Sequence, residues 1–133
     1  MEANNNFARQ LQGLPEGQSL ENCPVRQVMQ GIFSKWSTLL LQALGERPYR
    51  FGELRRLVPD ISQRMLTQTL RDLERDGYVY RTVHPTKPPS VEYGLTPLGH
   101  SMLVPLKELV DWATSNFSDV RAARDAYDAD ANG

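Results

Sequence analysis

The stretch SQRMLTQTLRDLERDG at positions 62–77 decides the fold, because it has a helix start, an apolar stripe and a helix stop. Ser62 is a favourable N-cap, since its side chain can accept a hydrogen bond from the first turn. Gly77 ends the pattern, as glycine commonly does at helix C-termini. The apolar positions between them recur at helical spacing and are Leu66, Leu70 and Leu73. The sequence therefore predicts a helix over 63–76 with one buried face.

The opposite face of this helix carries amide and guanidinium side chains near its start. Glutamine can pair with adenine and arginine with guanine in the major groove of DNA. We therefore expect Gln63, Arg64 and Gln68 to contact bases. Thr67 and Arg71 are expected to contact phosphates, or both phosphates and bases. The alternative is a plain solvated helix face, which is common in soluble proteins.

The flanking segments complete a helix-turn-helix followed by a wing. The apolar residues within 51–58 recur at helical spacing, and the short helix that they predict ends at Pro59. A tight turn then leads into the helix just described. Residues 78–84 and 91–95 are rich in β-branched and aromatic side chains and predict two strands. The proline-rich loop between them cannot pair well, so it forms the tip of a β-hairpin.

Further helices are expected on both sides of this unit. Pro24 suits a first helical position, and the pattern predicts a helical stretch that continues to Gly45, with a break or bend at Gly31 near its middle. A long helix with one apolar face begins at Thr96-Pro97. The predicted fold class is α+β, mostly α: a winged helix-turn-helix with extra N- and C-terminal helices that form a dimer interface. The expected parts are a flexible arm at 1–22, the DNA-binding and dimerisation domain at 23–118, and a frayed or disordered tail at 119–133.

Composition excludes several classes of protein. The chain has 133 residues, 40% apolar and 23% charged, which suits one globular domain. It shows neither a membrane-spanning run nor a secretory signal, so a cytoplasmic protein is expected. One cysteine excludes an intrachain disulfide and a multi-cysteine zinc site. His84, His100 and Cys23 are scattered, so we expect no catalytic residues, no metal, no cofactor and no enzyme activity.

Charge is distributed unevenly although the net charge is −1. Residues 47–90 contain nine Lys and Arg against five Asp and Glu, a local excess of +4 (9 − 5). Residues 97–133 contain three basic and six acidic residues, a local −3 (3 − 6). A basic middle supports contact with DNA phosphates if the fold gathers its charges. The expected additional phosphate contacts are Arg50, Arg55, Arg81 and the wing-tip Lys87.

The long C-terminal helix has more apolar positions than one small domain needs. These positions include Leu103, Leu106, Val110, Trp112 and Phe117. A two-fold partner helix would cover the surplus, and two recognition helices would then read a palindrome. Another interpretation is a small-molecule pocket between Trp36, Tyr93, Trp112 and the dimer helices. A third is a winged helix used only for protein contacts, which predicts no salt-sensitive DNA binding.

Several short motifs, in this order and spacing, resemble the HxlR-type family of bacterial winged-helix transcription regulators. The similarity covers roughly residues 23–112. The motifs are Cys23-Pro24-Val25, Lys35-Trp36, Arg50-Phe51-Gly52-Glu53-Leu54, Ile61-Ser62-Gln63-Arg64-Met65-Leu66-Thr67, Leu70-Arg71-Asp72-Leu73-Glu74-Arg75-Asp76-Gly77 and Val91-Glu92-Tyr93-Gly94-Leu95-Thr96. One departure is Gly31-Ile32-Phe33-Ser34, where the family more often has a Gly-Gly pair before Lys-Trp.

The resemblance implies a homodimer that binds double-stranded DNA, pairs through its terminal helices and controls transcription. Repression by blocking a promoter is the simpler expectation. In some relatives a cysteine at the position of Cys23 senses quinones, aldehydes or disulfide stress, so the resemblance allows a redox or electrophile switch. The expected start of a helix at Cys23 would favour its thiolate. The alternative is a small buried residue in the dimer contact, since a lone cysteine is usually buried.

Overall fold

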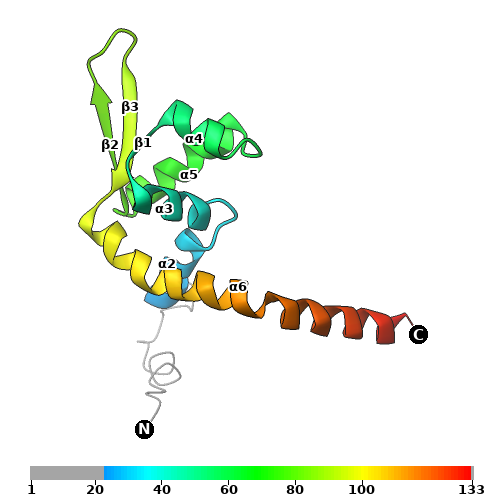
Figure 1. Cartoon of the computed structure of the whole chain (residues 1–133). Helices are drawn as coiled ribbons and strands as arrows, with labels where there is room; N and C mark the ends of the chain where they lie inside the picture. The colour runs from blue at the N-terminus through cyan, green and yellow to red at the C-terminus, as the bar shows by residue number, and fades with distance from the viewer. Residues whose placement is uncertain (1–22, 133) are drawn as a thin grey trace.

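The computed structural model describes residues 23–132 and confirms a winged helix-turn-helix of the α+β class (Figure 1). The expected flexible arm at 1–22 lies outside the described residues. The helices are α2 (Pro24–Ile32), α3 (Ser37–Glu46), α4 (Phe51–Leu57), α5 (Gln63–Arg75) and α6 (Pro97–Ala131). The strands are β1 (Tyr49–Arg50), β2 (Val79–His84) and β3 (Ser90–Leu95). None of these described helices is long and apolar enough to cross a bilayer.

Helix α5 has the start, the stripe and the stop that its sequence predicts. The Ser62 hydroxyl accepts a hydrogen bond from the backbone N–H of Met65 at 3.1 Å. The three stripe leucines are fully buried and belong to the single core cluster of the described residues. Gly77 has a φ of +85°, a conformation that L side chains rarely adopt, so the chain can turn sharply into β2. Burial of the leucine stripe leaves the polar face of α5 outward.

The sheet has three antiparallel strands in the order β1-β3-β2. The expected hairpin is present, with Val79 opposite Leu95 and His84 opposite Ser90. We call β2, β3 and their connecting loop the wing. Strand β1 was not predicted from the sequence. It has only two residues, Tyr49 and Arg50, which pair with β3. It ties the segment before α4 to the base of the wing.

The predicted helical stretch from Pro24 to Gly45 forms two helices, with the break next to the expected position at Gly31. The chain leaves α2 after Ile32, and the Thr38 hydroxyl donates to the Ile32 carbonyl at 2.9 Å from the start of α3. Gly45 does not end the second helix but lies inside it. A Cβ at this position would overlap the side chain of Leu103, so glycine lets α3 pack closely against α6.

The prediction of a frayed or disordered tail at 119–133 is wrong for the part of this segment that the structure describes, which is helical up to Ala131. Helix α6 passes through Pro105 and continues to Ala131, well beyond the start of the expected tail at residue 119. Alanine, which has the highest intrinsic helix propensity, recurs in this segment and favours the helix without tertiary contacts. Figure 1 shows this end of α6 running out from the body of the protein. The helix therefore crosses the expected domain boundary at residue 118.

Candidate nucleic-acid interface

The polar residues at the start of α5 line one hollow on the protein surface, with a volume of about 530 Å³. We call it the α5 hollow. Its lining is the complete set that the sequence predicted for this helix: Gln63, Arg64, Thr67, Gln68 and Arg71. All of these side chains except the half-buried Thr67 are exposed. The helix thus presents hydrogen-bonding groups outward over more than two turns.

A second hollow of about 390 Å³ extends this surface from α5 to the wing. We call it the wing hollow. Thr67 and Arg71 line both hollows, so the two are contiguous. Arg81 on β2 lies in the wing hollow, as do Glu74 and Tyr93, which the sequence did not assign to this surface. The fold therefore brings Arg81 to the same surface as the polar face of α5.

Three of the five side chains that line the α5 hollow already have hydrogen-bond partners among the described residues. The Gln63 side-chain oxygen accepts from Arg55 at 3.4 Å, and the Gln68 amide donates to Asp72 at 2.9 Å. The Thr67 hydroxyl donates to the Gln63 carbonyl at 2.9 Å. The two glutamine bonds are exposed, so DNA can replace each at small net cost. The spacing of four residues between Gln68 and Asp72 was the signal for this pairing in the sequence.

Arg64, like Arg71, differs from the three paired side chains of the α5 hollow, because no described residue forms a hydrogen bond or ion pair with its guanidinium group. It is exposed on the first turn of α5, beside the capped N-terminus. A guanidinium group offers five N–H donors in a fixed fork and stays charged at all physiological pH values. Arg64 thus presents an unpaired guanidinium fork at the N-terminal end of this surface, and its geometry suits a two-bond contact with a guanine edge.

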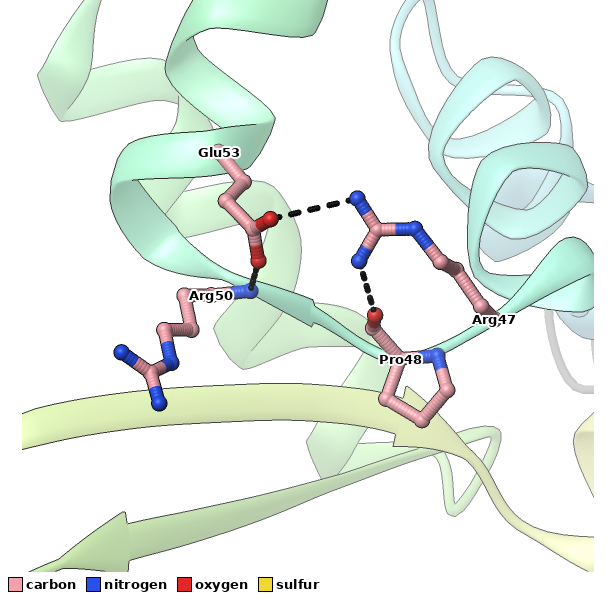
Figure 2. A network of polar contacts seen from close by, with 4 residues as sticks. All are labelled: Arg47, Pro48, Arg50 and Glu53. Atoms are coloured by element: carbon pink, nitrogen blue, oxygen red, sulfur yellow. Dashed lines mark hydrogen bonds and ion pairs between the residues drawn. The ribbon is translucent and has the colours of Figure 1, made fainter.

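Arg50 lies at the start of α4, next to a polar network that fixes its backbone (Figure 2). Its N–H donates to one Glu53 oxygen at 2.9 Å, while Arg47 donates to the other at 3.2 Å and to the Pro48 carbonyl at 2.9 Å. These hydrogen bonds hold the pKa of Glu53 below its usual range. The bond from the Arg50 N–H has the largest effect, and the bond from the Arg47 guanidinium has the next largest. Figure 2 shows the Arg50 guanidinium directed away from this network, so it remains open to solvent.

The remaining predicted phosphate contacts come from separate elements. Arg55 is exposed on α4 and reaches across to Gln63, so it adjoins the α5 hollow. Lys87 is exposed in the loop between β2 and β3, at the far end of the wing (Figure 1). Asp72 and Glu74 place negative charge near the C-terminal half of the same helix face. Exposed basic side chains thus lie on α4, on α5 and on the wing.

Cys23 precedes α2 at its N-cap position and is only 6% exposed. Its thiol forms no hydrogen bond with a backbone N–H of that helix. Cys23 is therefore buried within a single chain. Within residues 23–132, no group of three or more His, Cys, Asp and Glu residues is arranged to hold a metal ion.

The aromatic side chains proposed to form one ligand pocket do not share a hollow among those described. Trp36 lines a hollow beside α3, whereas Tyr93 lines the wing hollow. Trp112 is 57% exposed on α6. Among the hollows of residues 23–132 described here, none therefore joins these three side chains.

Comparison with known proteins gives consistent matches. The family model described as HxlR-like helix-turn-helix matches residues 31–121. The HTH-type transcriptional regulator YtfH of Escherichia coli is 44% identical over 115 residues, which cover 86% of this chain and 91% of that protein. A solved structure of the transcriptional regulator ytfH from Salmonella typhimurium is 42% identical, with a TM-score of 0.71 over 79% of this chain and 94% of that one. The solved structure of the redox regulator HypR in its reduced form is 38% identical. Its TM-score is 0.71, and the match covers 74% of this chain and 98% of that one.

Proposed function

Because the chain belongs to the HxlR-like helix-turn-helix family of transcriptional regulators, we propose that it binds a palindromic operator as a homodimer and represses transcription. The observation that carries this proposal is the α5 hollow, whose five lining side chains all suit base edges or phosphates. In this proposal Gln63, Arg64 and Gln68 contact bases, while Thr67 and Arg71 contact phosphates or both. Contact with phosphates by Arg50, Arg55, Arg81 and Lys87 fixes the register of the protein on the duplex.

The dimer is supported by apolar surface on the terminal helices. Leu103 and Leu106 are buried in the core, but Leu109, Trp112 and Phe117 farther along α6 are about half exposed. Val28, Met29 and Phe33 at α2 are exposed to a similar degree. A second copy that covers both helices would remove this surface from water, and a two-fold dimer is the commonest arrangement. Its two α5 helices would enter major grooves about 34 Å apart, or a multiple of that distance.

Trp112→Glu is expected to shift the protein from dimer to monomer at micromolar concentration, because it places a charge in the proposed apolar contact. Sedimentation velocity measures the distribution of the two species. The matched control is Val83→Glu on the wing, which replaces a side chain of similar exposure (51% against 57%) and should leave the dimer intact. A wild-type monomer under these conditions contradicts the proposed dimer.

Lys87→Ala is expected to lower affinity for all duplex sequences and to flatten the dependence of binding on salt. Each lost phosphate contact should reduce the slope of log K against log salt concentration by about 0.9. Fluorescence anisotropy with a labelled duplex between about 50 and 200 mM salt measures that slope. Lys107→Ala on α6 is the control for loss of an exposed lysine. An unchanged slope for Lys87→Ala would remove the wing tip from the phosphate contacts.

Repression follows from the size and geometry of such a dimer. Two bound winged helices cover adjacent turns of the duplex and can exclude polymerase from a promoter without a further contact. Activation would require an additional surface for polymerase. A reporter gene placed behind the selected operator tests this: deletion of the regulator should raise its expression, and a fall would indicate activation.

A second proposed feature is a response to oxidants or electrophiles through Cys23, supported by the similarity to the redox regulator HypR. The burial of Cys23 means that its helix must open, or the terminal helices must shift, before the thiol reacts. With one cysteine per chain, diamide can join the thiols of two chains or join Cys23 to a small thiol. Diamide should weaken operator binding by the wild type but not by Cys23→Ser. Equal responses of the two proteins would exclude the switch.

A further inference from the structure

A third hollow, of about 470 Å³, lies beside α3, β1 and the turn that joins α4 to α5. We call it the α3–turn hollow. Its volume falls within the range of small-molecule sites, and its lining is mainly apolar. Leu39 and Leu57, which are 42% and 49% exposed, contribute aliphatic surface. None of its lining residues belongs to the α5 hollow or the wing hollow. The DNA-binding proposal therefore leaves this surface without a role.

Two aromatic rings line the α3–turn hollow, and each already has a cation over its face. The Lys35 ammonium lies 5.1 Å from the centre of the Trp36 ring. The Arg47 guanidinium carbon lies 3.8 Å from the centre of the Tyr49 ring. A positive group over an aromatic face is attracted by the electron density of the ring. The face of Tyr49 is thus already covered by Arg47, and an added cation would compete with Lys35 for the face of Trp36.

Two carboxylates, Glu46 and Asp60, also line the α3–turn hollow and are exposed. Neither has an ion-pair partner among the residues of the described chain. Arg47, the nearest arginine in sequence, is paired with Glu53 at 3.2 Å, so its charge is compensated elsewhere. Lys35 is the cation that would compete for the Trp36 face. The uncompensated charge of the lining is therefore negative, which favours a cation and repels an anion.

We propose that the α3–turn hollow binds a small amphipathic organic cation. Its apolar body would pack against Leu39 and Leu57, and its ammonium group would lie between the Trp36 ring and the carboxylates of Glu46 and Asp60. The occupant would contact the turn that precedes the N-cap of α5. This goes beyond the proposed DNA binding, because the site is complete in one chain and can be tested without DNA.

The test uses benzyltrimethylammonium as the cationic probe, with benzyl alcohol and benzoate as neutral and anionic aromatic controls. The chain has two tryptophans, so ¹H–¹⁵N NMR of the full protein gives two indole N–H signals, assigned with Trp36→Phe. The cation should move the Trp36 signal saturably and leave that of Trp112 in place. Benzyl alcohol and benzoate should bind at least about tenfold more weakly. Binding of benzoate as tight as the cation, no saturable shift, or a shift at Trp112 alone overturns the proposal.

Variants with altered charge test whether the carboxylates bind the cation. All of them alter exposed side chains. The double variant Glu46→Gln and Asp60→Asn should weaken the probe about tenfold. Its matched control, Asp125→Asn and Asp128→Asn, removes as many carboxylates from the outer end of α6 and should bind like the wild type. Lys35→Gln should strengthen binding, because it removes the competing cation. Circular dichroism checks that each variant is folded, and unchanged affinity of the folded Glu46/Asp60 variant overturns the site.

Discussion

Gly99→Ala is expected to destabilise the protein by about 3 kcal/mol, at the upper end of the usual cost of overpacking. A Cβ on Gly99 would overlap the carbonyl oxygen of Tyr78 and lie 3.1 Å from its carbonyl carbon. That carbonyl is held in place, because it accepts the Thr96 N–H at 3.0 Å while the Thr96 hydroxyl donates to Gly77 at 2.5 Å. Backbone rather than a flexible side chain must move, so the first turn of α6 has to separate from the base of the wing.

Thermal unfolding followed by circular dichroism measures this effect, and a fall in the midpoint of more than about 10 °C is expected. Gly52→Ala is the matched control, because it is the same substitution in an exposed helix position. A Cβ there meets only the end of the Arg56 side chain at 3.7 Å, an ordinary contact. Better helix propensity should therefore leave Gly52→Ala as stable as the wild type or more stable. Equal stability of the two variants would show that α6 is not packed against Tyr78 in this way.

Arg64→Ala is expected to weaken binding to the operator by about 1–3 kcal/mol and to affect scrambled DNA much less. The reason is its position on the first turn of α5 in the α5 hollow, with its guanidinium unpaired among the described residues. The operator is first found by in vitro selection. Affinities for that operator and for a scrambled duplex, measured at the same salt concentration, then give the ratio of specific to non-specific binding.

Arg75→Ala is the control for Arg64→Ala, since it removes the same side chain from the same helix outside both hollows. It should reduce the two affinities equally and slightly. If Arg64→Ala also lowers both affinities by one factor, Arg64 contacts phosphate rather than a base.

Local signals in the sequence were sufficient for α5 and the wing. Ser62 and Gly77 mark the ends of α5, and the spacing of its leucines decides which face is buried. The face left outward is then fixed by geometry, which is why the α5 hollow contains the residues that the pattern selected. The hairpin followed from β-branched strands on both sides of a proline-rich loop.

Tertiary packing decided what local patterns could not. Strand β1 is too short to carry a pattern and exists because Tyr49 pairs with Tyr93 on β3. Gly45 looked like a helix end, but its role depends on Leu103 from a distant part of the chain. The same limit applies to Tyr93 and Glu74, which join the wing hollow only after the wing has packed beside α5 through β2.

The most direct test of the central claim is a missing-contact experiment on the operator. Methylation of guanine N7 blocks one acceptor of the major-groove edge that an arginine would bind. For the wild type, methylation should interfere at a guanine in each half-site, and Arg64→Ala should lose sensitivity at that guanine while keeping the rest of the pattern. An interference pattern identical for wild type and for single alanine variants of Gln63, Arg64 and Gln68 would contradict base reading by this face of α5.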